Sequence, residues 1–385
     1  MNTADAVVIG GGVIGTSIAY RLAEYRKVVL IEQGEIGAQT SGSCDKAIFL
    51  QSKKPGFPIK LAKASREIYE NLEEELGMSI EFKTNGGMIV MESEAHMEAM
   101  KKFVKERRKA GMDVRLLDRQ EVHAWQPSLS SHIIGASWCS QDAEVNPLLL
   151  SQAFARAAKR RGVEMRTHTE VIDILCEHQK VVGVQTSHGH IATGTVVNAA
   201  GPFASKIAEM AGVGLTIMPR RGAILITEKM NPMIHGNILC SQYIAAKHAA
   251  SDTYDMPSYG IGLSLGQTAS GNLLIGGSRE FKGFDKSVGP EVLSAIAKHA
   301  SRIAPVLHNV KVIRSMVGFR PFTGDGLPII DQAKEVEGFI IAAGHEGDGI
   351  ALAPITGHLV AGLLENQEQY QDLLKPLRLD RLQAV

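Results

Sequence analysis

The first residues with a spacing that could do chemistry are three glycines near the start of the chain. Gly10, Gly12 and Gly15 follow an apolar run at residues 6–9 and open a stretch with helical spacing. Gly10 permits a tight turn, Gly12 lets the backbone approach a pyrophosphate, and Gly15 lets a helix pack closely on a strand. The free N–H groups at the start of that helix can bind phosphate. The spacing therefore predicts a dinucleotide-binding unit.

An acidic residue completes this unit. Glu32 ends the second apolar strand, which begins near Lys27, and a carboxylate there can accept hydrogen bonds from both hydroxyls of an adenosine ribose. An ordinary glycine-rich turn would leave the placement of Glu32 unexplained. A signal peptide is the other alternative for the apolar residues 6–23. We reject it because no basic segment precedes them and the glycines interrupt any spanning helix.

A second glycine motif lies near the other end of the chain. Residues 318–331 and 339–350 place glycine turns on both sides of an apolar strand, and a helix is expected at residues 351–364. The start of that helix can stabilise negative charge. Two such helix ends suit FAD better than NAD, because the second can stabilise an electron-rich isoalloxazine near N1 and C2=O. The alternative is a helix capped by glycines for local reasons.

Composition limits the classes of partner. The chain has 385 residues, and 41 Lys plus Arg balance 41 Asp plus Glu. This balance gives no electrostatic reason to expect nucleic acid or an anionic membrane, so small molecules are the expected partners. The four cysteines lack CxxC spacing, which indicates a reducing compartment and no metal site. No uninterrupted apolar run reaches about 18 residues, so we expect no transmembrane segment and a soluble cytoplasmic protein.

The predicted elements indicate an α/β fold in two domains. One is a discontinuous Rossmann-like FAD-binding domain at residues 1–80, 145–215 and 318–385. The other is an α+β substrate domain, rich in antiparallel sheet, at residues 81–144 and 216–317. The local predictions are a small-residue loop at 37–43, helices at 59–76, 93–111 and 147–161, a strand at 86–92, a hairpin around 187–190 and a loop or lid at 247–259.

Together these motifs resemble the D-amino-acid oxidase superfamily of FAD enzymes, near its glycine oxidase and sarcosine oxidase (beta subunit) type members. The resemblance covers nearly the whole chain. It rests on residues 8–15, 40–43, 86–87, 142–147, 198–201, 318–321 and 344–349. It implies that Glu32 binds the adenosine ribose, that Val171 contacts adenine through its backbone and that the turn at residues 344–350 faces the flavin.

The resemblance also implies which residues bind FAD and how. Members with covalent FAD have a cysteine at the turn aligned with Gly318, and this chain has no cysteine after Cys240, so we expect non-covalent FAD. The residues expected to bind it are Gly10, Gly12, Val13, Ile14, Gly15, Glu32, Gln33, Thr40, Ser41, Gly42, Ser43, Val171, Ala200, Gly201, Gly344, His345, Glu346, Gly347, Asp348, Gly349 and Ile350.

The resemblance finally implies the chemistry. Family members oxidise a C–N bond of an amino or imino acid by hydride transfer from the α-carbon to flavin N5, and water hydrolyses the imine. Arg320 is our candidate anchor for the substrate carboxylate, since a guanidinium can hold a carboxylate with two hydrogen bonds. A surface or salt-bridged arginine is the alternative. Expected substrates are glycine, sarcosine, proline or an opine.

Three hypotheses for the function stay open. The chain oxidises its substrate alone and passes electrons to oxygen, or it is the flavin-carrying beta-type subunit of a dehydrogenase and passes them to a partner subunit. The third is a binding protein without chemistry. The residues do not fix the oligomeric state, and we expect an oligomer.

The chain departs from glycine oxidase at several positions. Glu346 and Gly347 stand where glycine oxidase has a second arginine, and Tyr254 and Tyr259 are weak candidates for a substrate-contacting tyrosine. His345 either tunes the flavin, together with Asp348, or caps a helix. Lysines and arginines close to the motifs are expected to be solvated surface residues, namely Lys46, Lys53, Lys54, Arg220 and Arg221. The alternatives are that the lysines approach the flavin or activate oxygen, and that the two arginines bind an acidic side chain or a flavin phosphate.

Overall fold

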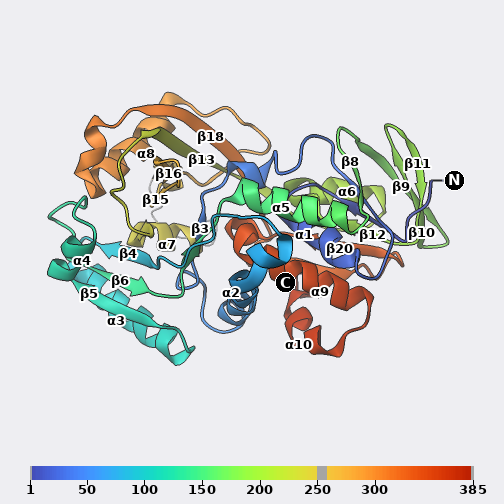
Figure 1. Cartoon of the computed structure of the whole chain (residues 1–385), viewed down its shortest axis with the longest axis horizontal. Coiled ribbons are helices and arrows are strands. Elements are labelled where there is room, and N and C mark those ends of the chain that lie inside the picture. Colours follow the sequence, from blue (N-terminus) through green and yellow to red (C-terminus); the bar gives the residue numbers. More distant parts are fainter. Residues whose placement is uncertain (1, 249–257, 383–385) are drawn as a thin grey trace.

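The computed structural model describes residues 2–248 and 258–382, apart from the side chains of 245–248 and 258. It consists of two lobes side by side, each built on its own β-sheet (Figure 1). The sheet of one lobe is mainly parallel and the larger sheet of the other lobe is mainly antiparallel. The predicted α/β fold with a second, antiparallel-rich part is confirmed.

The mainly parallel sheet has the strand order β19-β20-β12-β1-β2-β8. Only the edge strand β19 runs antiparallel to its neighbour among the strands of this order. Continuous apolar runs such as Ala-Val-Val-Ile in β1 are typical of strands that are buried on both faces. The bounds are β1 Ala6–Ile9, β2 Val28–Ile31, β8 Glu164–Arg166, β12 Val196–Asn198, β19 Ile329–Gln332 and β20 Phe339–Ala343.

Different elements cover the two faces of this sheet. Ala6 and Val8 of β1 belong to one hydrophobic core, while Val7 and Ile9 belong to another, because side chains alternate along a strand. The first core holds α1 (Val13–Leu22), α2 (Phe57–Leu76), α5 (Pro147–Arg160) and α9 (Gly349–Leu364). The second holds β9 (Val171–Glu177), β10 (Lys180–Thr186), β11 (Gly189–Ala192) and α6 (Ala204–Met210). The first βαβ unit is thus fixed from both sides.

One helical stretch in the described part of the chain, Glu346–Leu364, is long and apolar enough to cross a membrane. Most of it is buried, and its helix α9 packs against α1 and α2. Because α9 lies between other elements of the core, it is apolar on nearly every side.

The larger sheet has the order β17-β13-β16-β15-β14-β4-β6-β5, and β18 pairs with β13. A third core lies between this sheet and α8. The strand bounds are β4 Gly87–Met91, β5 Val114–Asp118, β6 Gly135–Cys139, β13 Met218–Lys229, β14 Asn237–Cys240, β15 Ser264–Gln267, β16 Asn272–Gly276, β17 Glu280–Phe281 and β18 Val312–Phe322. The helices are α3 Glu94–Lys109, α4 Arg119–Trp125, α7 Ser241–His248 and α8 Pro290–Ile303. The small pair β3 (Ala47–Ile48) and β7 (Ala143–Glu144) and the terminal α10 (Gln371–Leu374) complete the named helices and strands.

Most local predictions agree with the structure to within a few residues. Ser93 caps α3 as expected, since its hydroxyl accepts a hydrogen bond from the backbone N–H of His96 at 3.2 Å. The hairpin around 187–190 is formed by β10 and β11. The second strand of this hairpin is short, since β11 ends at Ala192, and the next strand, β12, belongs to the parallel sheet.

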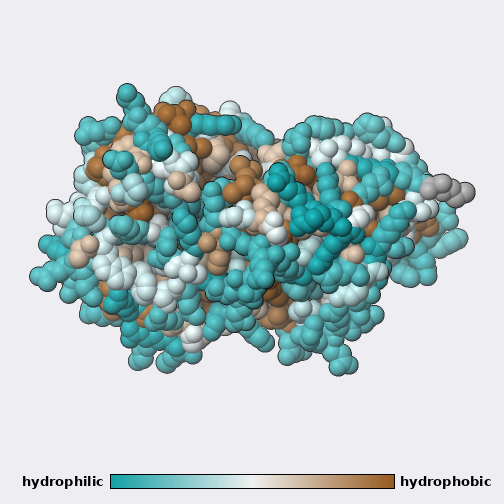
Figure 2. Space-filling model, viewed as in Figure 1, coloured by the Kyte–Doolittle hydropathy of each residue, from teal (hydrophilic) through white to brown (hydrophobic). Residues whose placement is uncertain are grey.

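The stretch predicted as a loop or lid at 247–259 begins inside a helix, since α7 reaches His248. Its central part, 249–257, lies outside the described residues. The face of the molecule in Figure 2 is largely hydrophilic with scattered hydrophobic residues, as on most folded proteins.

Candidate active site

The main cavity lies where the carboxyl ends of the central parallel strands meet. The turns after β1, β2, β12 and β20 all contribute to its lining, through Gly10, Glu32, Ala199 and His345. In the sheet, β2 lies on one side of β1 and β12 lies on the other, so the connections run in opposite directions from this point. Ligands of open α/β sheets bind at the point where the strand order reverses. The cavity volume is about 560 Å³, within the range of ligand sites.

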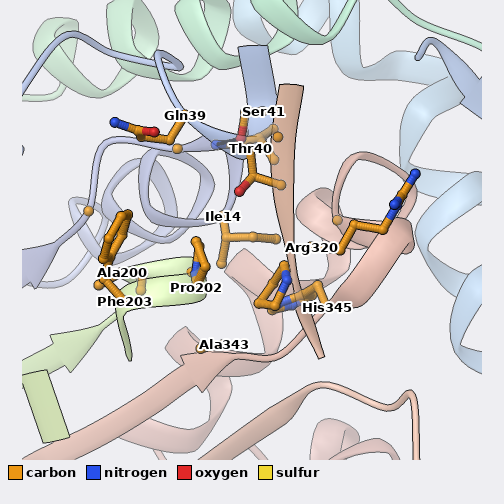
Figure 3. A pocket seen from close by; sticks show the side chains of 18 of the residues that line it. Ile14, Gln39, Thr40, Ser41, Ala200, Pro202, Phe203, Arg320, Ala343 and His345 are labelled. Atoms are coloured by element: carbon orange, nitrogen blue, oxygen red, sulfur yellow. Dashed lines mark hydrogen bonds between the residues drawn. The ribbon is translucent and has the colours of Figure 1, made fainter. Parts of the chain in front are cut away.

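Both lobes line this cavity. Figure 3 shows Pro202 and Phe203 on one side and Arg320, from β18, on the opposite side, with Ile14 and His345 between them. A ligand that spans the cavity would therefore contact the dinucleotide-binding turn and the larger sheet together.

The first glycine turn has the geometry that the sequence predicts. Gly10 adopts φ +113°, and a Cβ at this position would collide with the backbone of Ala199. A Cβ at Gly15 would collide with the carbonyl oxygen of Gly10. Gly12 is the N-cap of α1 and lines the cavity, and the next N–H, that of Val13, donates to Ser41 Oγ at 3.0 Å. The N–H of Val13 is therefore occupied, and the start of α1 offers an anionic group the positive end of the helix dipole at the cavity-lining Gly12.

Glu32 is held rigidly beside this turn. Its Oε2 accepts from the backbone N–H of Gly11 at 2.6 Å, and its Oε1 accepts from that of Gly34 at 2.8 Å. The side chain is buried and lines the cavity. A carboxylate has about four acceptor sites, so two remain for ligand hydroxyls.

The structure brings most of the predicted site residues to this one cavity. Those that line it are Gly10, Gly12, Val13, Ile14, Glu32, Gln33, Thr40, Ser41, Ser43, Val171, Ala200, Gly201, Arg320, His345, Glu346, Gly347, Gly349 and Ile350. Gly15, Gly42, Gly344 and Asp348 lie behind this lining. Gly42 packs on the carbonyl of Gly37, and Gly344 adopts φ +83° in the turn after β20.

His345 is neutral in this fold. It is buried, and its Nε2 lies 3.0 Å from the Thr356 hydroxyl. Burial lowers the pKa of His345 to about 3, although the charge of Asp348 acts in the opposite direction. The imidazole therefore adds no positive charge to the cavity at neutral pH.

Two of the lysines near the motifs are not solvated, which corrects the prediction for them. Lys53 is buried and its Nζ lies 2.6 Å from Asp348 Oδ1. Lys46 is buried and its Nζ lies 2.7 Å from Glu144 Oε2. Their carboxylate partners come from distant segments that the fold brings close, whereas Lys54 is exposed as expected.

Arg220 and Arg221 are also buried, contrary to the prediction of solvated side chains. Neighbouring residues of a strand point to opposite faces. Arg220 forms an ion pair with Glu346 on the cavity side. Arg221 pairs with Glu280 at 3.1 Å on the other face of the strand.

Arg320 lies opposite Arg220 in the β13–β18 ladder. Its guanidinium extends over Gly222, where a Cβ would overlap it, and its Nη1 donates to the carbonyl of Ser278 at 3.2 Å. Burial lowers the pKa of Arg320, and the next largest cause is the nearby charge of Arg279. Arg320 is thus a cavity-lining cation with nitrogens available to a ligand.

Sequence reasoning missed several lining residues. Tyr243 of α7 lines the cavity, whereas Tyr259, one of the two predicted candidates, does not. Tyr259 has a partly exposed side chain, and Tyr254 lies outside the described residues. Phe203 and Phe284 also line the cavity, with their rings stacked at 4.7 Å. No sequence motif identifies these aromatic residues, because the packing of distant segments places them at the cavity.

These features fit FAD. The positive end of the α1 dipole suits a pyrophosphate, Glu32 suits a ribose, and the turn before α9 places a second helix end beside the same cavity.

Comparisons with known proteins agree with this geometry. Residues 5–363 match the model of the family described as "FAD dependent oxidoreductase". Glycine oxidase of Bacillus subtilis (strain 168) is 31% identical, with 99% of this chain and 98% of that protein covered. Hydrogen cyanide synthase subunit HcnC of Pseudomonas aeruginosa is 29% identical, with 95% and 93% covered.

A solved structure agrees equally well. L-proline dehydrogenase from P. horikoshii superposes with a TM-score of 0.87 at 28% identity, with 99% of this chain and 98% of that chain covered. The predicted resemblance and the FAD cofactor are confirmed, and the chain belongs to the FAD dependent oxidoreductase family.

Proposed function

We propose that this protein oxidises the C–N bond of a small amino or secondary amino acid of the glycine, sarcosine, proline or opine type. The observation that carries the proposal is that Arg320 lines the same cavity as the dinucleotide-binding turn at Gly10–Val13. A carboxylate anchor and a cofactor site then share one cavity. Similarity to glycine oxidase and L-proline dehydrogenase supports this substrate class.

Each group has a defined role in this proposal. Bound FAD supplies a hydride acceptor for the α-hydrogen of the substrate. Arg320 binds the substrate carboxylate and fixes the α-carbon, which converts an encounter into an aligned reaction. The amine loses its proton to solvent, and water hydrolyses the resulting imine. Because His345 is neutral, the cation that faces the substrate is an arginine.

The remaining assignments belong to the same proposal. FAD is held without a covalent bond by the predicted residues that line the cavity. The segments 1–80, 145–215 and 318–385 form the FAD-binding domain, and 81–144 and 216–317 form the substrate domain. The protein acts in the cytoplasm as an oligomer.

A second candidate function is that of a flavin-carrying subunit that passes electrons to a partner protein. Similarity to hydrogen cyanide synthase subunit HcnC, a part of a larger enzyme by its name, favours it. The oxidation half of the reaction is the same in both candidates, and they differ in the electron acceptor.

The test is an anaerobic absorbance titration of the purified yellow protein. Glycine, sarcosine, D-alanine, L-proline, D-proline and an opine are added in turn, and air is then admitted. Loss of the flavin band with one of these supports amino-acid oxidation, and no loss with any of them contradicts it. Rapid return of colour in air indicates an oxidase, while slow return indicates a partner subunit.

A further inference from the structure

A second arginine, Arg279, lies on the cavity side of the larger sheet. In the ladder of β13 and β17, Arg221 pairs with Glu280, so the antiparallel register places Arg279 beside Gly222. Paired residues of neighbouring strands point to the same face. Gly222 lines the cavity, so Arg279 lies on the cavity side of the sheet, directly behind the lining residues Gly222 and Tyr243 and not among them.

The surroundings of Arg279 agree with this placement. Its guanidinium lies 4.1 Å from the centre of the Tyr243 ring, and Tyr243 lines the cavity. Arg279 also exerts the largest charge effect on Arg320. The two guanidinium groups are therefore close neighbours, one on each side of Gly222.

Arg279 is buried but incompletely paired. The residue is 7% exposed, and its Nε and Nη1 have no hydrogen-bond partner within residues 2–248 and 258–382. An unpaired buried charge is costly, and proteins normally supply a partner for it. A buried guanidinium with vacant donors directly behind the cavity wall can bind an anionic group that reaches it from the cavity.

The acidic groups nearby are bound elsewhere. Glu346 forms the ion pair with Arg220. Asp45 lines the cavity, and its Oδ2 accepts from the Ser264 hydroxyl at 2.7 Å. Among the described residues, neither carboxylate accepts a hydrogen bond from Arg279 or Arg320, so the two arginines keep donors for a ligand.

We infer that Arg279 and Arg320 together bind a substrate with two carboxylates, such as an iminodiacid or an acidic amino acid. Arg320 holds the carboxylate next to the reacting carbon, and Arg279 holds the second one. This inference rests on the proposed function, because it names the substrate class of the same site. It also explains how the chain compensates for the arginine that Glu346 and Gly347 replace.

Binding of carboxylates that cannot be oxidised tests the inference without turnover. Calorimetric titration of the holoenzyme at fixed ionic strength compares acetate and propionate with malonate, succinate and glutarate. We expect at least one dicarboxylate to bind about tenfold or more tightly than either monocarboxylate. Equal binding of both classes to the wild-type protein overturns the inference.

Variants assign the second carboxylate to its arginine. Arg279→Gln should weaken binding of the preferred dicarboxylate about tenfold or more while changing acetate binding less than about twofold, and Arg279→Lys should restore part of the loss. Arg221→Gln is the matched control, because it removes a buried arginine from the opposite face of the same sheet. A loss of both ligand classes in Arg279→Gln, or an equal loss in Arg221→Gln, contradicts the assignment.

Anaerobic flavin reduction by sarcosine and iminodiacetate separates this inference from the proposed function. The two amines differ by one carboxylate. If iminodiacetate reduces the flavin at lower concentration and Arg279→Gln abolishes that preference, both proposals stand. If sarcosine reduces the flavin and dicarboxylates bind no tighter, the inference alone fails. If dicarboxylates bind through Arg279 and no amine reduces the flavin, the proposed function alone fails.

Discussion

The cavity has a nucleotide side, at residues 10–32, and an arginine side, at Arg279 and Arg320. Their buried polar groups find hydrogen-bond partners in different ways. On the nucleotide side, both oxygens of Glu32 and the N–H of Val13 are hydrogen-bonded within the chain before any ligand binds. On the arginine side, Arg279 keeps vacant buried donors among the described residues. The first side is organised by the chain itself, whereas the second needs a ligand to complete its hydrogen bonding.

The largest effect should follow from removing the substrate anchor. Arg320→Ala is expected to lower the second-order rate of flavin reduction by the preferred amino acid about 10³-fold, because charge-assisted hydrogen bonds to a carboxylate are lost. Stopped-flow absorbance under anaerobic conditions measures this rate. Flavin content should stay unchanged, since the anchor lies on the arginine side.

Arg320→Lys is the companion variant. It keeps the charge but loses the planar fork, so it should recover part of the rate. A protein that loses FAD on the Arg320→Ala change would show that the two sides are not separate. Unchanged kinetics would remove Arg320 from the binding of substrate.

A smaller effect is expected on the nucleotide side. Glu32→Ala should weaken FAD binding about 10- to 100-fold, because a charged acceptor is lost and the N–H groups of Gly11 and Gly34 are left without their partner. Fluorescence of flavin released on dilution measures the dissociation constant. Glu35→Ala is the control, since Glu35 is exposed and should leave FAD binding unaltered. Equal FAD binding in both variants would contradict the role of Glu32.

The contrast between the two sides also explains what the sequence could predict. The features from Gly10 to Glu32 belong to one continuous strand–turn–helix–strand unit, so their spacing alone indicates their geometry. Arg320 and the turn at 344–350 could be placed at the site through the family resemblance, and both line the cavity.

The rest of the site could not be predicted because it depends on contacts between distant segments. Arg279 and Gly222 are neighbours because β13 and β17 pair, and Tyr243 reaches them from α7. Lys53 and Asp348 are far apart in sequence and meet in the interior. A single arginine or lysine carries no local sequence pattern that shows whether its side chain is solvated or buried in an ion pair. The prediction of a surface position was therefore wrong for the residues whose ion-pair partners are distant in sequence.

The smallest expected effect concerns the source of positive charge in the cavity. If arginines supply it, His345 must stay neutral, with its pKa lowered to about 3 in the folded protein from an ordinary value of about 6.5. The unfolded chain then binds a proton between these values and the folded protein does not, so stability falls as pH decreases from about 6.5 toward 3. At pH 5 this one group should lower the free energy of unfolding by about 2 kcal/mol relative to pH 7.

His345→Gln should therefore reduce the drop in Tm between pH 7 and pH 5, whereas replacement of the exposed His308 by Gln should leave this drop unaltered. A drop that is the same in His345→Gln and wild type would mean that burial does not lower the pKa of His345, and the arginines would then share the positive charge of the cavity with this histidine below about pH 6.5.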